Sequence, residues 1–258
     1  MFLWNPELLE GFFLAFLRCS TALVLMPIFG FNGIPNQIKA GPALILAIIM
    51  APEASQNLFN APPGVMAMAT VAISEVLVGL VFGMVTTLIL VSAEFAGTIV
   101  GMQMGFAIVN LFDPQLGQVA LIGRYQYFVA MIIFLCLDMH LPFLRALGDS
   151  FVLIPLGSAL FQDAIAMQYA RLSAQVFVIA IKIAAPVMAM MFITELTLGV
   201  IARVVPQMNV FIVGFPLKIG VGMYGLVITG PLFVFVIAKV FRGYEHELRT
   251  IMILLSGS

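Results

Sequence analysis

The sequence predicts an all-α integral membrane protein made of irregular helical hairpins, and three observations lead to this fold class. Hydrophobic residues make up 63% of the 258 residues and charged residues only 9%, whereas soluble domains carry about 25% charged residues. The apolar residues gather in roughly six long runs, as membrane helices require. The runs differ widely in length and several contain a charge, which makes the expected hairpins irregular.

Three hydrophobic runs occupy the first part of the chain. A helix needs about 20 apolar residues to cross a hydrocarbon core of about 30 Å. Residues 11–31 meet this length but contain Arg18, residues 41–52 are too few, and residues 65–93 are too many and contain Glu75. At about 1.5 Å per residue, the third run would reach about 43 Å. These lengths predict helices that do not simply cross a bilayer one by one.

Three further runs occupy the rest of the chain. Residues 125–147 include several polar residues, residues 164–202 are long enough for a helical hairpin, and residues 219–238 carry no charge. The 11 basic residues are spread almost evenly along the chain, so the excess of Lys and Arg that marks cytoplasmic loops gives no orientation. We therefore expect helices that pack against other proteins. The most polar linker is residues 52–64, and a second divide around residues 147–163 predicts two parts, residues 1–160 and a C-terminal hairpin at residues 161–258.

Enzymatic chemistry has no support in the sequence. The two histidines are His140 and His246, and neither lies in a zinc-protease pattern. Asp138 and His140 could be two metal ligands, but no third candidate is near them in the sequence. The sequence therefore predicts a protein that is not an enzyme and uses no cofactor or metal. The net charge of −1 gives no reason to expect a nucleic-acid partner.

Charged residues interrupt the apolar runs at Glu75, Lys182 and Glu195. A charge at bilayer depth costs about 2.5–3.5 kcal/mol, so each should contact a partner or a cavity. We favour polar contacts that fix assembly with neighbouring subunits, and the alternative is the coupling site of a secondary transporter. Arg203 lies eight residues after Glu195, a spacing that suits pairing with a third group better than direct contact.

Glycines recur at four-residue spacing in one long segment. Gly97, Gly101 and Gly105 would share one helix face, and Gly79 and Gly83 repeat the spacing. A face without side chains lets a neighbouring helix approach closely. We therefore expect a neighbouring helix to pack closely against this face. Ordinary packing between helices would explain the same glycine spacing.

The segment after these glycines, FAIVNLFDPQLGQ at residues 106–118, is an apolar loop in which Asp-Pro and Gly should end a helix. Irregular backbone is costly in lipid and fits where protein surrounds it or where it closes a cavity. One interpretation is a hydrophobic constriction that gates a pore; the other is a loop that folds onto its own helices. The pore-closing side chains would be Met102, Met104, Phe106, Ile108, Val109, Leu111, Phe112 and Leu116.

The stretch RVVPQMNVFIVGFPLKIGVG at residues 203–222 interrupts the last long apolar region. Its two prolines each remove a helix hydrogen bond, and the amide side chains nearby can satisfy the freed backbone groups. We expect a hairpin tip or a broken helix, with VFIVGF buried between two polar rims. The residues predicted to act in assembly here are Arg203, Pro206, Gln207, Asn209, Pro216 and Lys218.

Residues 203–222 resemble the C-terminal signature of the FliR family of flagellar type III export-gate membrane proteins, whose injectisome relatives are called SctT. The segment GMQMGFAIVNLFDPQLGQ at residues 101–118 is similar to the family's central glycine-rich helix and the loop after it. The N-terminal half matches in layout, with a first hydrophobic helix, the turn FGFNGIPNQIKAG at residues 29–41, and the long run that contains Glu75. The resemblance covers essentially the whole chain, and PLK at residues 216–218 favours the flagellar branch.

The resemblance implies a component of a protein export channel in the bacterial inner membrane, within the flagellar basal body. Such proteins join FliP and FliQ around a single FliR, with FlhB outside, at the entrance for unfolded export substrates. The N-terminal part would be FliP-like and the C-terminal hairpin FliQ-like. Carried over by position, residues 106–118 would plug the closed pore. Met102 and Met104 would lie near the level of the family's gasket, and the helix face with Gly97, Gly101 and Gly105 would lie along the channel. A scaffold that never touches substrate is a further interpretation.

Overall fold

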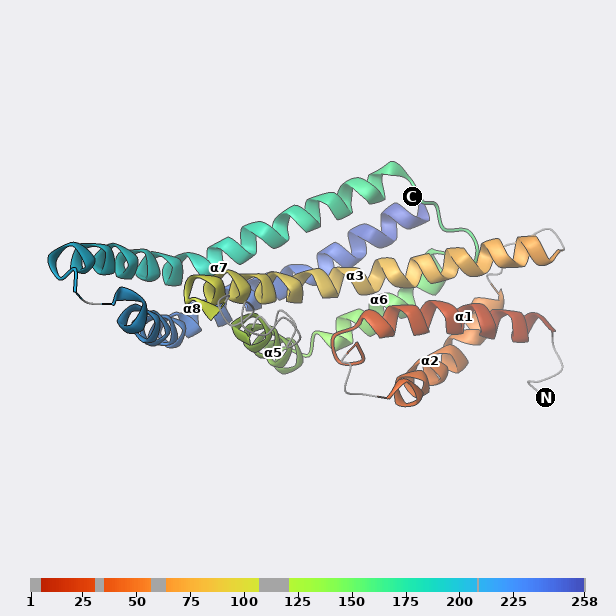
Figure 1. The fold of residues 1–258 in the computed structure, drawn as a ribbon. Coiled ribbons are helices and arrows are strands. Elements are labelled where there is room, and N and C mark those ends of the chain that lie inside the picture. The colour runs from red at the N-terminus through yellow and green to blue at the C-terminus, as the bar shows by residue number, and fades with distance from the viewer. Residues whose placement is uncertain (1–5, 31–34, 57–63, 107–120, 208, 258) are drawn as a thin grey trace. The chain divides into compact units, whose positions relative to one another are not determined.

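The described part of the chain is helical, as the sequence predicts. The computed structural model describes residues 6–30, 35–56, 64–106, 121–207 and 209–257. Within these residues there is no β-strand, and the all-α prediction is confirmed. The α-helices, labelled in Figure 1, are α1 (Pro6–Leu25), α2 (Asn36–Gln56), α3 (Val65–Gln103), α5 (Leu121–Cys136), α6 (His140–Leu153), α7 (Asp163–Val204) and α8 (Val210–Ser256).

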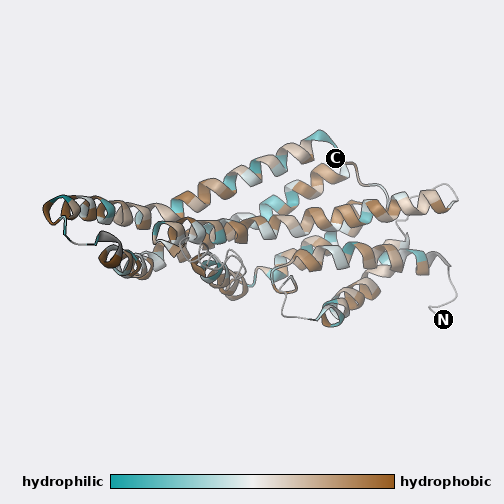
Figure 2. Cartoon of the chain, in the orientation of Figure 1, coloured by the Kyte–Doolittle hydropathy of each residue, from teal (hydrophilic) through white to brown (hydrophobic). Residues whose placement is uncertain are grey.

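Five of the described helices are long and apolar enough to cross a membrane: α1, α2, α3, α7 and α8. Helices α5 and α6 together would provide a sixth span if they act as one broken helix. The expectation of about six hydrophobic segments is therefore confirmed for the described residues. Figure 2 shows apolar residues, in brown, on most turns of these helices, with isolated polar positions in teal between them.

Several helices are longer than the apolar runs that predicted them. Helix α3 continues beyond residue 93 to Gln103 and has 39 residues. Helix α7 is one helix of 42 residues rather than a hairpin, and it is followed by α8 with 47. Helix propagation adds one hydrogen bond per residue once the first turn exists, so a helix continues through isolated charged residues when one face of it is packed.

Prolines lie inside three of the helices. Pro42 and Pro52 belong to α2, Pro186 to α7, and Pro216 and Pro231 to α8. A proline removes one backbone hydrogen bond, and helices of membrane proteins tolerate this because neighbouring groups satisfy the freed carbonyl. The expectation that Pro216 breaks the helix is therefore wrong.

The chain divides into two compact units, and α3, α7 and α8 each contribute to both. Unit 1 contains Met1–Leu88, Asp138–Ser173 and Phe241–Ser258, and unit 2 contains Ile89–Leu137 and Ala174–Val240. The predicted division into a FliP-like part at residues 1–160 and a FliQ-like part at residues 161–258 remains a prediction.

In unit 1, α1 packs against α2 and against the first part of α3. A Cβ added at Gly83 would lie 3.0 Å from the carbonyl oxygen of Ala22, and one added at Gly79 would overlap α1. The hydroxyl of Thr87 donates to the carbonyl oxygen of Leu25 at 2.9 Å. The close approach predicted from the spacing of these two glycines is therefore confirmed.

The ends of α7 and α8 complete unit 1. The hydroxyl groups of Tyr244 and Thr86 share a buried hydrogen bond, and the Tyr169 hydroxyl donates to the backbone of α3. The backbone N–H of Leu160 donates to the carbonyl oxygen of Leu255 at 3.0 Å. The largest apolar and aromatic side chains that are fully buried here include Phe82, Phe143, Phe151, Phe241 and Tyr244.

Unit 2 joins the second part of α3 to α5 and to the facing portions of α7 and α8. The ring of Phe95 meets the ring of Phe177 edge-on, with 5.3 Å between the centroids. Small and branched side chains fill the rest of the core, including Ala93, Ala96, Val100, Ile122, Ala130, Ile183, Val187 and Ile237. Many large apolar side chains of α7 and α8 stay exposed within this chain, so this unit covers only part of its own apolar surface.

Candidate functional site

Arg18 of α1 and Glu75 of α3 form an ion pair in the core of unit 1. Both side chains are 0% exposed, and Arg18 Nε lies 2.5 Å from Glu75 Oε2. One terminal nitrogen of the guanidinium donates to the carbonyl and hydroxyl oxygens of Ser150, at 3.0 and 3.2 Å, and the other donates to the carbonyl oxygen of Ile154 at 3.1 Å. The backbone N–H of Gly157 donates to the second carboxylate oxygen of Glu75 at 2.9 Å.

This network explains how two charges can lie in an apolar core. Carbonyl groups at the end of a helix need donors from outside it, and Arg18 supplies one to the carbonyl oxygen of Ile154, just after the end of α6. The ring of Phe151 adds a cation–π contact, with its centroid 4.6 Å from the guanidinium carbon. A buried ion pair is tolerated when its remaining donors and acceptors are also satisfied. The pair therefore fixes α1, α3 and the end of α6 to one another.

The sequence predicts Glu75 at a contact between subunits, whereas in the structure its own chain encloses the carboxylate. The basic partner is available 57 residues earlier, on another helix. Sequence reasoning missed Arg18 as this partner. The signal was present, because each of the two apolar runs holds a single charge and the two charges have opposite sign.

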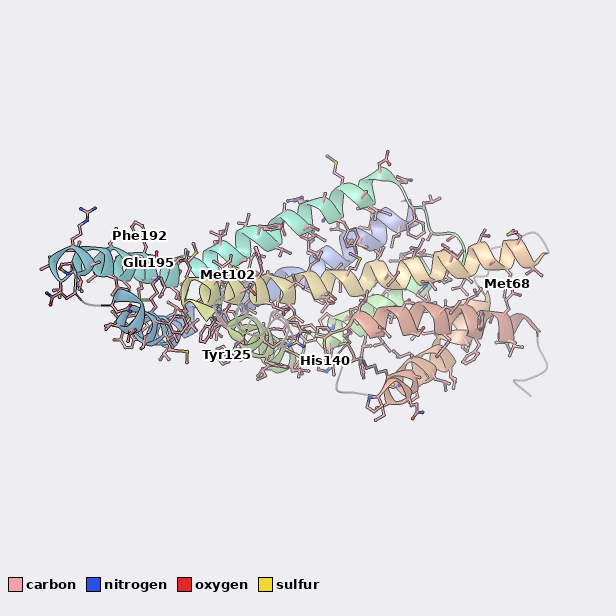
Figure 3. All side chains as sticks on the ribbon, in the orientation of Figure 1. Met68, Met102, Tyr125, His140, Phe192 and Glu195 are labelled. Carbon is pink, nitrogen blue, oxygen red and sulfur yellow. The ribbon has the colours of Figure 1, made fainter. Side chains whose placement is uncertain are left out.

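Lys218 of α8 and Glu195 of α7 form a second ion pair, in unit 2. Lys218 Nζ lies 2.7 Å from Glu195 Oε1, and the two side chains are 26% and 42% exposed. Figure 3 labels Glu195 on α7. The sequence predicts that Glu195 and Arg203 pair with a third group at a subunit interface; within the chain Glu195 pairs with Lys218, and the interface role stays a prediction. Lys182 and Arg203 are exposed, and their roles in assembly remain predictions.

The interruption between α7 and α8 is a hairpin tip. Helix α7 ends at Val204 and α8 begins at Val210. Pro206, Gln207 and Asn209 lie between them and are exposed. The carbonyl oxygen of Asn209 accepts hydrogen bonds from the backbone N–H groups of Ile212, at 3.1 Å, and of Val213, at 3.4 Å. The prediction of a hairpin tip is confirmed at Pro206.

In the apolar stretch VFIVGF after this tip, Gly214 is buried and Phe215 is half-buried, whereas the two branched residues before them are exposed. Ile212 is 71% exposed and Val213 is 46% exposed, so the expectation of a stretch buried between two polar rims is wrong for the isolated chain. A hairpin tip projects beyond the helices that could cover it, and the described residues offer no other cover. These side chains are available to a partner.

Gly97 marks a close backbone-to-backbone contact between α3 and α5 in unit 2. A Cβ at Gly97 would lie 2.6 Å from the Cα of Gly123 and 2.6 Å from the carbonyl oxygen of Ile122, both on α5. A Cβ at Gly101 would make only an ordinary contact, 3.5 Å from the Cβ of Ile122. Gly105 lies beyond the end of α3, so the expectation of three glycines on one helix face is wrong for the third. Their place along a channel remains a prediction.

The two methionines at the end of α3 differ in their surroundings. Met104 is 0% exposed, whereas Met102, labelled in Figure 3, is 61% exposed. Gly105 follows with φ +90°, a conformation that favours glycine and turns the chain out of the helix. Phe106 is half-buried. The other predicted plug residues, Ile108, Val109, Leu111, Phe112 and Leu116, lie outside the described residues.

The described residues offer packing surfaces and ion pairs. Among the described residues, no three side chains of His, Cys, Asp or Glu gather in a way that could hold a metal ion. The features that the structure does bring together are a satisfied ionic core in unit 1 and, in unit 2, a tightly packed end of α3 beside a partly covered hairpin.

Comparisons with known proteins identify a family for this chain. The chain matches the model of the family described as bacterial export proteins, family 1, over residues 9–244. It is 34% identical over 259 residues to the flagellar biosynthetic protein FliR of Bacillus subtilis (strain 168), with 98% of each chain covered. It is 29% identical to the FliR of Pectobacterium carotovorum subsp. carotovorum, with 86% of this chain and 84% of that one covered.

A third relative extends over almost the same length. The flagellar biosynthetic protein FliR of Aquifex aeolicus (strain VF5) is 26% identical, with 93% of each chain covered. The family match begins in α1 and ends in α8, so it includes both ion pairs, the glycine-rich end of α3 and the hairpin tip. This chain belongs to the FliR family, family 1 of the bacterial export proteins.

Proposed function

We propose that this chain is a subunit of the flagellar protein export gate, and that it helps to form and close the channel through which unfolded flagellar proteins pass. As a member of the FliR family it is a component of the flagellar export apparatus, and its long apolar helices make it a membrane protein. The partners we propose are FliP, FliQ and FlhB, in the bacterial inner membrane within the basal body. The role is not enzymatic.

The observation that carries this proposal is apolar surface on helices too long for a bilayer to cover. Exposed apolar side chains of α8 extend from Ile212 to Ile253, which are 71% and 53% exposed. At 1.5 Å per residue this stretch is about 60 Å long. Those of α7 extend from Met167 to Val204, which are 78% and 73% exposed, or about 55 Å. A hydrocarbon core of about 30 Å, crossed at a tilt of about 20°, leaves much of this surface for protein partners to cover.

The gate itself is proposed at the end of α3 and in the segment that comes after it. The complete burial of Met104 supports a role in anchoring the end of the helix, and the exposure of Met102 supports a role facing the channel. The plug role of residues 106–118 is supported by their apolar sequence, because apolar side chains are disfavoured in water and irregular backbone is costly in lipid.

The ion pairs provide no support for a secondary transporter. Glu75 is bound to Arg18, and Glu195 is bound to Lys218. Each carboxylate that the sequence offered as a coupling group therefore already has a basic partner in the chain, and a translocated ion is not needed to explain its position.

Deleting residues 106–116 tests the proposal. The helices that we expect to contact partners are unchanged, so the complex should still assemble, while membranes that contain it should leak ions and small molecules. Native mass spectrometry of the gently extracted complex measures assembly, and ion conductance in planar bilayers measures leakage. A second variant that keeps the length but replaces the apolar residues with serine separates the effect of the apolar side chains from that of the missing chain.

Two results would contradict the proposal. An assembled deletion complex that conducts no more than the unmodified complex would remove the gate from this segment. A monomer or homo-oligomer after gentle extraction would remove the heteromeric channel. Cross-linking from a photoreactive residue at position 112 to a stalled export substrate then distinguishes a gate from a scaffold that never touches substrate.

A further inference from the structure

We propose that Phe215 and Gly222 of α8 are positioning residues for the gate, because they hold the end of α3 where the gate segment begins. Neither residue is among the gate residues predicted from the sequence. The inference rests on the proposed function and adds to it the element that sets the closed position.

The end of α3 is enclosed by α8 at two successive residues. The Met104 side chain lies against Gly222, where an added Cβ would overlap Met104 Cγ and lie 2.7 Å from its Sδ. A Cβ added at Gly105 would lie 2.9 Å from Cε2 of the Phe215 ring. All four residues belong to unit 2. Because Met104 packs on Gly222 and the ring of Phe215 packs on Gly105, the end of α3 has little room to move.

The backbone makes these two contacts decisive for the direction of the chain after α3. The N–H of Met104 donates to the carbonyl oxygen of Val100, and the N–H of Gly105 donates to that of Met102, both at 3.0 Å. The helix ends there, and the positive φ of Gly105 sets the direction in which the chain leaves it. Phe106, the next residue, is the first of the predicted plug. The packing of Met104 and Gly105 against α8 therefore fixes the position from which the proposed plug segment begins.

Helix α8 is held in turn by α7. Lys218 lies between Phe215 and Gly222 in the sequence and pairs with Glu195 of α7 at 2.7 Å. A Cβ added at Gly225 would lie 2.7 Å from the Cε of Met190, also on α7. Residues 215–225 thus contact the end of α3 and the facing helix of the hairpin at the same time. A partner that shifts the hairpin would move the end of α3 with it.

The variant Gly222→Ala tests the contact from one side. The new methyl group occupies space that Met104 fills, and the flexible thioether can move aside, so the complex should still assemble. Overpacking of this size shifts a two-state balance by about tenfold, and ion conductance of the assembled complex in planar bilayers should rise by a similar factor. Native mass spectrometry of the same preparation confirms that all subunits are present.

Gly220→Ala is the matched control. It is the same substitution in the same helix, and nothing lies within 4 Å of its added Cβ, so conductance should not change. Met104→Ala completes a double-mutant cycle. With the thioether gone, the methyl of Gly222→Ala partly fills the vacated space, so the double variant should conduct less than the product of the two single effects.

The inference is overturned if assembled Gly222→Ala conducts as little as the unmodified complex, if Gly220→Ala raises conductance equally, or if the double variant equals the product of the single effects. Should Gly222→Ala fail to assemble, Phe215→Leu removes volume instead, and an assembled Phe215→Leu complex without added conductance overturns the inference as well. If deletion of residues 106–116 causes leakage and the α8 variants do not, only the positioning role falls. If that deletion causes none, the gate and its positioning residues fall together.

Discussion

The two ion pairs of this chain lie in opposite environments and teach different things. Arg18 and Glu75 are completely buried in unit 1, and backbone groups of the same chain satisfy their remaining donors and acceptors. Lys218 and Glu195 are partly exposed in unit 2, beside apolar side chains that the chain leaves uncovered. The first pair determines how the chain folds, whereas the second belongs to a surface that a partner can complete.

The largest expected effect comes from breaking the buried pair. Arg18→Met or Glu75→Leu leaves one charge buried without its partner, which should destabilise the fold by about 3–5 kcal/mol. This is a large part of the roughly 5–15 kcal/mol by which proteins are stable. The yield of monodisperse protein and the midpoint of thermal unfolding in detergent measure the loss. The double variant should recover only part of it, because the carbonyl oxygen of Ile154 and the N–H of Gly157 lose their side-chain partners.

Charge reversal sharpens the comparison. Arg18→Glu with Glu75→Arg should not restore stability, because a carboxylate at position 18 cannot donate to the carbonyl oxygens of Ser150 and Ile154. Lys218→Glu with Glu195→Lys should restore whatever the single changes lose, because water reaches this pair. If the two reversals behave alike, the proposed difference between the pairs is wrong.

An intermediate effect is expected where unit 2 has its own tight contact. Gly97→Ala would press a methyl group against the backbone of Gly123, which cannot rotate away, so we expect a loss of about 1–3 kcal/mol. Gly101→Ala is the matched control, since its methyl meets Ile122 at an ordinary distance and alanine favours the helix by about 1 kcal/mol. Thermal unfolding of the purified complex compares them. Equal losses would show that the contact at residue 97 is not special.

The smallest effect on the chain itself is expected at the exposed pair. Lys218→Ala should change the unfolding free energy by no more than about 1 kcal/mol, as exposed ion pairs usually do. Its effect on assembly should be larger, since both side chains lie on the surface proposed to meet partners. Co-purification of the partner subunits measures this, and Arg203→Ala, which changes a basic residue at the same hairpin tip, should reduce it too. An intact complex that no longer exports would indicate a transport role for these residues instead.

The sequence predicts the helices of this protein better than the contacts between them. Apolar runs and their interruption at Pro206 lead to the all-α fold, about six hydrophobic segments and the hairpin tip. Proline alone does not decide where a helix ends, however: Pro216 lies within α8, because the loss of one backbone hydrogen bond is tolerated in a helix of a membrane protein. Gly105 shares the spacing of Gly97 and Gly101, yet it lies past the last turn of α3.

The pairings could not be read from the sequence because they join distant residues. Arg18 reaches α6 across 132 positions, and Gly222 receives Met104 from another helix. Spacing along one helix indicates which residues share a face, but not which neighbour meets that face. For the same reason, the sequence does not predict the contacts on the channel side of the proposed gate, since the groups that would surround it belong to other subunits.

The uncovered apolar surface of α7 and α8 has a consequence for the life of this protein in the cell. A newly made copy without partners exposes side chains such as Phe192 and Phe235, which are 61% and 65% exposed, along helices that lipid cannot fully shield. Such a copy is an orphan subunit, open to aggregation and to membrane proteases. We therefore expect its half-life to depend on the supply of the other gate subunits, and overproduction of this chain alone to yield degradation rather than surplus protein.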